Sequence, residues 1–138
     1  MDKKLHDLRH DTSKAEKFFT KLMAYTLGPM ELKTMFENHS KDENENKDKS
    51  KIVIIDVRDK EDYSAGHIPN AISIPRNNLE ERLSELSKDD IHIVYCYNQQ
   101  CHLGLCACRL LASKDYPCMH LDGGYKVWSE DFRFATVK

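Results

Sequence analysis

The run IVIIDV over residues 52–57 restricts the possible folds more than any other segment of the chain. All of its residues except Asp56 are β-branched and apolar. A strand with one solvent-facing side would alternate apolar and polar residues, whereas a strand covered on both faces has a continuous apolar run. The run therefore predicts a central strand of a parallel sheet with helices on both sides.

Strand-like and helix-like segments alternate after this run, which is typical of a three-layer α/β domain with a parallel sheet. In such sheets ligands bind at the carboxyl ends of the strands, so the residues that follow each strand are candidates for a functional site. The predicted elements are strands at 92–95 and 118–121, helices at 79–86 and 103–113, and a last helix carrying Val127 and Trp128 after the Gly123-Gly124 turn.

The segment 1–27 is predicted to form a tail and a helix that precede the domain. Residues 1–12 are charged and aperiodic, so we expect a loose tail. Apolar residues at helical spacing then predict a helix that begins with Ser13 as N-cap and Glu16 completing a capping box. Gly28 and the proline after it are expected to end this helix.

The domain itself is predicted to span residues 28–138. Pro29 suits the first turn of a second helix. Residues 38–51 contain no apolar side chain and cannot contribute to a core, so an exposed polar loop is expected there.

The charge and the apolar pattern exclude several classes of protein. With 21 Lys and Arg against 23 Asp and Glu, the net charge is −2, which argues against a nucleic-acid-binding protein. No apolar run approaches the roughly 20 residues that a membrane crossing needs, and the first residues lack a secretory leader. We expect a cytoplasmic protein with no membrane and no nucleic-acid partner, while a protein partner stays open.

The chain has five cysteines, and four of them lie within residues 96–108. Cys96 directly follows the strand IHIVY and precedes a loop that opens a helix, where backbone N–H groups and the helix dipole favour an anion. A free cysteine has a pKa of about 8.5, and such a position lowers it toward a reactive thiolate. Cys96 is therefore predicted to be a nucleophile, although a small apolar packing role is the simpler alternative.

Three segments in this order resemble the signatures of one known family: IVIIDVRDKEDYSAGHIPNAISIP, VYCYNQQCHLGLCACRLLASKDYP and LDGGYKVW. They are similar to the first signature, the active-site strand, loop and helix, and the closing Gly-Gly-X-X-X-Trp of rhodanese-like domains. The resemblance covers about residues 28–131. Residues 13–27 also resemble the extra N-terminal helix of some single-domain members.

This resemblance implies a central parallel sheet of about five strands and the activity of a sulfurtransferase. The family's cysteine takes sulfane sulfur from a small donor anion such as thiosulfate and passes it, as a persulfide, to cyanide or a thiol acceptor. On the match Cys96 is the catalytic cysteine, and no cofactor is implied. The expected anion-binding loop consists of Tyr97, Asn98, Gln99, Gln100, Cys101, His102, Leu103 and Gly104, with backbone N–H groups pointing inward.

The loop departs from the family pattern in two ways. The distance from Cys96 to the helix residue Leu111 is longer than usual, and Cys101 stands where many active members carry arginine or another polar group. His102 is then the only nearby side chain expected to become positive, so reaction with thiosulfate is expected to be weak. Three roles remain open for Cys101: a thiol that resolves the Cys96 persulfide or sulfenate into a disulfide, the nucleophile itself, or a passive loop residue.

Two other functions are weighed from the same residues. A phosphatase would need a Cys-X5-Arg loop, and position 102 is His. A binding module that senses redox state through Cys96 and Cys101, or has no thiol chemistry, is the main alternative to the enzyme.

The remaining polar and thiol groups near these motifs are assigned to structural support or packing. No Cys-X2-Cys pair occurs, so a metal site at Cys96, Cys101, His102 and Cys106 is not expected. The residues expected only to support the fold are Asp56, Arg58, His67, Gly123 and Gly124, while Cys106, Cys108 and Cys118 are expected to pack.

Overall fold

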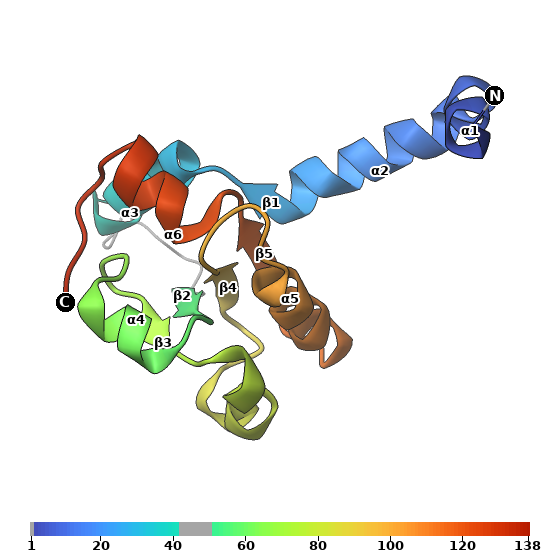
Figure 1. Cartoon of the computed structure of the whole chain (residues 1–138). Helices are drawn as coiled ribbons and strands as arrows, with labels where there is room; N and C mark the ends of the chain where they lie inside the picture. Colours follow the sequence, from blue (N-terminus) through green and yellow to red (C-terminus); the bar gives the residue numbers. More distant parts are fainter. Residues whose placement is uncertain (1, 42–50) are drawn as a thin grey trace.

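A computed structural model describes residues 2–41 and 51–138. Its centre is a five-stranded parallel sheet in the order β1-β5-β4-β2-β3 (Figure 1). The strands are β1 (Thr26–Leu27), β2 (Ile52–Asp56), β3 (Ile72–Ser73), β4 (Ile91–Tyr95) and β5 (Cys118–Leu121). This confirms the predicted three-layer α/β fold.

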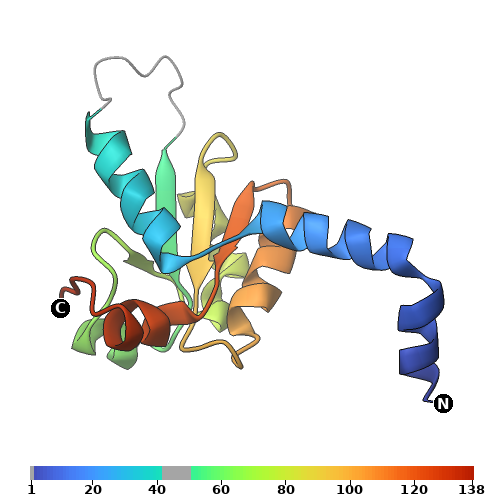
Figure 2. The same ribbon diagram turned by 90° about the horizontal axis from the view of Figure 1, so that it is seen from above.

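Helices cover both faces of the sheet, as the run at 52–57 predicts. Helix α3 (Pro29–Lys41), α6 (Gly124–Lys126) and the π-helical stretch η3 (Val127–Asp131) pack on one face around Ile54 and Trp128. Helix α5 (Leu103–Ser113) and the 3₁₀ turns η1 (Arg76–Asn78) and η2 (Glu80–Glu85) cover the other face around Ile55. Adjacent residues of β2 thus enter opposite core layers. Figure 2 shows the two helical layers on either side of the strands.

The N-terminal segment differs from the predicted tail and helix. Residues expected to be a loose tail form helix α1 (Lys3–His10), and α2 (Thr12–Tyr25) follows at an angle to it. Asp11, not Ser13, is the N-cap of α2, because its carboxylate accepts the N–H of Lys14 at 3.3 Å.

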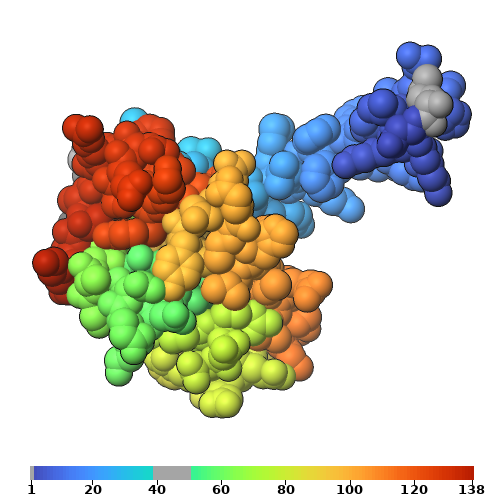
Figure 3. Space-filling view, in the orientation of Figure 1, coloured from blue at the N-terminus to red at the C-terminus, as the bar shows by residue number. Residues whose placement is uncertain are grey.

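The first strand of the sheet precedes residue 28, where the domain is predicted to begin. Helix α2 ends at Tyr25, and Thr26 and Leu27 pair in parallel with His120 and Leu121 as the edge strand β1. Leu27 is only 3% exposed, so this strand belongs to the core. Helices α1 and α2 project from the domain with several exposed apolar side chains (Figure 3).

Helix α3 continues to Lys41, so the first residues of the predicted polar loop at 38–51 are helical. Residues 42–50 lie outside the described residues. The helix expected at 79–86 is the 3₁₀ turn η2, while α5 has the predicted bounds. In the described ranges, 2–41 and 51–138, no helix is both long and apolar enough to cross a bilayer.

Candidate active site

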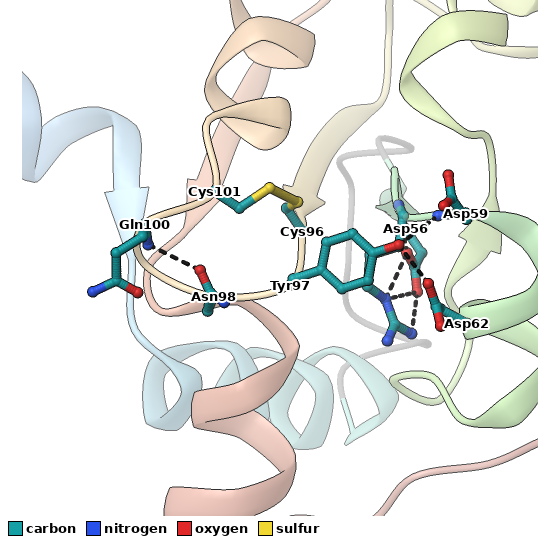
Figure 4. The surroundings of a disulfide bond; sticks show 9 residues. Asp56, Asp59, Asp62, Cys96, Tyr97, Asn98, Gln100 and Cys101 are labelled. Carbon is teal, nitrogen blue, oxygen red and sulfur yellow. Dashed lines mark hydrogen bonds and ion pairs between the residues drawn. A yellow bond between two sulfur atoms is a disulfide. The ribbon is translucent and has the colours of Figure 1, made fainter.

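Cys96 lies where the sequence predicts, directly after the last residue of β4. It is 1% exposed and packs in the core layer under α5. Its sulfur is bonded to Cys101 in a disulfide, with the two Cα atoms 6.5 Å apart (Figure 4). The loop therefore brings the two predicted reactive cysteines together, in their oxidised form.

The amides of this loop do not all point toward Cys96 as predicted. The side-chain oxygen of Asn98 accepts the N–H of Gln100 at 3.0 Å, and its carbonyl accepts the N–H of Cys101 at 3.2 Å. Asn98 forms a local turn that satisfies these two amides, which is a common role for this residue type. Gln99 and Gln100 are exposed at the tip of this turn. In the oxidised loop these two N–H groups thus already have acceptors within the turn.

The N-terminus of α5 lies against Cys96. Helix α5 begins at Leu103, and His102, its exposed N-cap residue, makes no side-chain cap hydrogen bond. A Cβ placed on Gly104 would lie 3.6 Å from the Cβ of Cys96, so the first turn of the helix meets the cysteine closely. The first N–H groups of a helix have no intrahelical acceptor and favour an anion.

His120 is a site residue that the sequence analysis missed. A Cβ on Gly104 would be 2.5 Å from Nε2 of His120, which places this imidazole beside the first turn of α5. Burial lowers the pKa of His120, and the charge of Asp122 opposes this only in part. His120 is thus a second imidazole beside the site, and its lowered pKa favours the neutral form. Alternation along residues 118–121 predicts only that Cys118 and His120 share a face of β5, not that α5 covers it.

A buried ion pair holds the neighbouring strand end. Arg58 binds Asp56 through Nε at 3.1 Å and through Nη2 at 2.8 Å, and Nη2 also donates to the carbonyl of Gly66 at 2.6 Å. The two side chains are buried, at 4% and 0% exposed. Burial alone would lower the pKa of Arg58, but the hydrogen bonds and charge of Asp56 outweigh it and raise that pKa.

The guanidinium of Arg58 is also enclosed by three aromatic rings. Its central carbon lies 4.1 Å from the ring centre of Tyr125, 5.7 Å from that of Tyr97 and 5.8 Å from that of Tyr95. Cations over aromatic faces are stabilised by the ring quadrupole. Arg58 thus links β2, β4 and α6, and its charge is already paired.

Tyr97 connects the reactive loop, residues 96–104, to helix α4 (Lys60–Ala65). Its hydroxyl donates to Oδ2 of Asp62 at 2.5 Å and accepts the N–H of Asp59 at 3.2 Å (Figure 4). Burial, together with the hydrogen bond to Asp62, raises the pKa of this hydroxyl. Its backbone carbonyl also accepts the N–H of Lys126 at 2.9 Å, so Tyr97 is held through both its ring and its backbone.

Gly123 and Gly124 allow α6 to approach the loop. Their φ angles are +83° and +64°, a region that disfavours other residues. A Cβ on Gly124 would lie 2.7 Å from the carbonyl oxygen of Cys96. The next two backbone N–H groups donate to the carbonyls of Cys96 and Tyr97, each at 2.9 Å.

His67 lies away from the thiols and contacts a loop and the C-terminal segment. Its ring stacks on Tyr63 with the centroids 3.7 Å apart, and Nδ1 is 2.9 Å from the carbonyl of Tyr63. Its backbone pairs with Val137 in an isolated antiparallel bridge. These contacts suit a supporting residue better than a reacting one.

In the ranges that the structure describes, no three His, Cys, Asp or Glu side chains gather as metal ligands. Cys118, expected to be a buried packing residue, is only half-buried, and its sulfur lies 3.3 Å from the carbonyl of Cys108.

Comparison with known proteins gives consistent matches. The sequence model of the rhodanese-like domain family matches residues 40–131. Over 82 residues the chain is 32% identical to the thiosulfate sulfurtransferase GlpE of Pseudoalteromonas translucida. This alignment covers 59% of this chain and 76% of that protein. The crystal structure of the BH2092 protein from Bacillus halodurans aligns with a TM-score of 0.75 and 27% identity, over 92% of this chain and 86% of that chain.

A longer relative is the HTH-type transcriptional regulator Rv0324 of Mycobacterium tuberculosis, which is 38% identical over 77 residues. That alignment covers 56% of this chain and 34% of the relative. The chain therefore spans about a third of the regulator's length.

Replacing Arg58 with Met should destabilise the protein strongly, because Asp56 would remain buried without its partner. The expected loss in the free energy of unfolding is about 3–5 kcal/mol, measured by urea denaturation. Arg82→Met is the matched control: its pair with Glu85 lies at the surface, so the expected loss is below about 1 kcal/mol. Equal losses for the two variants would contradict this account of Arg58.

Gly124→Ala should displace the loop, because the new Cβ would meet the backbone of Cys96 and Asn98 at a positive φ. We expect a loss of about 2 kcal/mol or more in the free energy of unfolding. Gly28→Ala, where the nearest atom is Oε1 of Glu31 at 4.0 Å, should change it by less than about 1 kcal/mol. A neutral Gly124→Ala would show that the close approach is unimportant.

Proposed function

Because the chain belongs to the rhodanese-like domain family, we propose that it is a sulfurtransferase that carries sulfane sulfur as a persulfide on Cys96. The observation that carries this proposal is the position of Cys96, at the end of β4 and against the first turn of α5. The relative named thiosulfate sulfurtransferase supports the same reaction class.

The proposed reaction has two transfers. The Cys96 thiolate attacks the outer sulfur of a donor such as thiosulfate; a sulfur–sulfur bond forms on Cys96 and sulfite leaves with the electron pair of the broken bond. A thiolate acceptor, or cyanide, then attacks the outer sulfur of the persulfide and releases Cys96 as thiolate. Both steps need Cys96 in its anionic form.

Two features support an anionic Cys96 in the reduced protein. The α5 N-terminus meets it at Gly104, and loop N–H groups freed when the disulfide opens add further donors. His120, beside the same helical turn, is the nearest imidazole to take up the thiol proton, but burial lowers its pKa and so opposes this transfer. The contributions of the helix and the loop must exceed the cost of burying a charge, since Cys96 is in a mostly apolar layer.

The positive charge of Arg58 does not serve the donor anion, because Asp56 already neutralises it. A dianionic donor would therefore depend on backbone N–H groups alone. This supports the expectation that thiosulfate reacts weakly and that less charged donors, such as polysulfides, react better.

Among the three roles for Cys101, we propose that of resolving thiol, because its sulfur is bonded to that of Cys96. The Cys101 thiolate attacks the inner sulfur of the Cys96 persulfide, which forms the disulfide and expels hydrosulfide. A dithiol reductant then restores both thiols. Such a cycle suits a reducing compartment, so we propose a cytoplasmic location. The same disulfide also supports the alternative of a redox-sensing module without transfer.

Substitution of each cysteine separates these functions. After exposure to polysulfide, Cys96→Ser should carry no cyanide-releasable sulfur, because it has no persulfide site. Cys101→Ser should retain the persulfide, while hydrosulfide release without added acceptor falls about tenfold or more, because the resolving thiol is absent. Intact mass and peptide mapping measure the first result, and sulfide detection measures the second.

Cys106→Ser, on helix α5, is the control and should behave as the wild type. If Cys96→Ser still accepts sulfur and Cys101→Ser does not, Cys101 is the nucleophile. If neither cysteine holds sulfur but the disulfide opens and closes reversibly, the redox-sensing alternative is correct.

A further inference from the structure

A second pair of cysteines lies under helix α5, apart from the Cys96–Cys101 disulfide. Cys108 is on the helix and Cys118 is the first residue of β5. The Cys118 thiol donates a hydrogen bond to the carbonyl oxygen of Cys108 at 3.3 Å, and the two side chains also interact with each other. Neither takes part in a disulfide, and both are half-buried. The fold therefore places two reduced thiols next to each other, although they belong to different elements.

The two thiols have different acidities. The hydrogen bond from Cys108, which is the largest effect, lowers the pKa of Cys118 to about 7 even though burial opposes it. The same contact, followed by burial, raises the pKa of Cys108. Of the two thiols, Cys118 therefore loses its proton more easily, and Cys108 keeps its proton longer. A more acidic thiol beside a less acidic one is the arrangement of an attacking and a resolving cysteine.

Cys118 is also open to a small molecule. It lines a surface hollow of about 340 Å³ together with Tyr25, Ala112, Asp115, Tyr116 and Pro117. This volume lies at the lower end of the range for small-molecule sites.

His92 contacts the residue that precedes Cys118 in the chain. His92 is the register partner of Cys118 on β4, is fully buried, and holds the carbonyl of Pro117 through Nδ1 at 2.8 Å. Cys118, which lines the hollow, is therefore held at the first residue of β5.

We propose that Cys108 and Cys118 form a second thiol–disulfide site, which reacts with a small-molecule disulfide that enters this hollow. The Cys118 thiolate attacks one sulfur of the molecule; a mixed disulfide forms on Cys118 and the other half leaves as a thiolate. Cys108 then loses its proton and attacks the Cys118 sulfur, which closes the Cys108–Cys118 disulfide and expels the second thiolate. The protein dithiol is oxidised and the external disulfide is reduced to two thiols.

This site is independent of the proposed sulfur transfer at Cys96. Closure would join α5 to β5 covalently, ten positions apart in the sequence. Because α5 carries Gly104 against Cys96 at its other end, the closed disulfide would hold that helix in place on the sheet.

The experiment uses the full chain with Cys96→Ser and Cys101→Ser, treated with bis(2-hydroxyethyl) disulfide at pH 7. We expect the intact mass to fall by two hydrogen masses, and peptide mapping to find a Cys108–Cys118 link. Adding Cys108→Ser, which keeps a hydrogen-bond donor but cannot close the ring, should leave a stable hydroxyethyl adduct on Cys118. Adding Cys118→Ser instead should leave Cys108 unmodified.

Cys106, a half-buried cysteine on the same helix, is the internal reference. Cys118 should react with bis(2-hydroxyethyl) disulfide about fivefold faster than Cys106, or more. If the chain with Cys96→Ser and Cys101→Ser does not fold, the Cys108–Cys118 link is sought by the same peptide mapping in the wild-type chain with its Cys96–Cys101 disulfide closed. An adduct on Cys108 in the Cys118→Ser chain, a Cys118 adduct that persists beside intact Cys108, or faster reaction at Cys106 would each overturn the proposal.

Discussion

The buried pair of Asp56 and Arg58 is the interaction on which the geometry of the site depends. It lies at the end of β2, where a parallel sheet brings strand termini together. A single guanidinium binds a carboxylate, the carbonyl of Gly66 and three tyrosine rings, so one side chain orders the end of β2, the segment after α4 and the start of α6. Removing either charge would leave the other unpaired in the core, which is why this support is both strong and vulnerable. The charge of Arg58 is paired with that of Asp56.

The reactive loop rests on that support through Tyr97 and Gly124. Tyr97 fixes the residue after Cys96, and the glycine lets α6 approach the backbone closely enough for hydrogen bonds. From Cys96 to Cys101 the chain forms its own turn, which is closed by a hydrogen bond to Asn98 and by the disulfide. In the oxidised form the Cys96 sulfur is uncharged, so its burial costs little. The proposed sulfur transfer requires a thiolate at the same position after reduction, and stabilising it would depend on the nearby helix N-terminus and loop amides.

Much of the fold was predictable because its signals are local. Continuous β-branched runs predict buried parallel strands, and the bounds of α5 follow from its apolar spacing. The short edge strand at Thr26 and the polar helix α1 were not predictable, since two residues give no alternation and charged residues gave no clear helical stripe. The position of Cys96 followed from its strand. The contacts of His120 and Cys118 depend on how β5 aligns with α5, and sequence spacing alone does not determine that packing.

The central claim is that the fold makes Cys96 a thiolate near neutral pH. The direct measurement is the rate at which iodoacetamide alkylates Cys96 as a function of pH, in the reduced Cys101→Ser chain, followed by mass spectrometry of the peptide that contains Cys96. The account predicts a midpoint about one unit or more below the value of about 8.5 for a free cysteine. A midpoint at or above that value would mean that burial outweighs the helix N-terminus and the loop amides, and would contradict the claim.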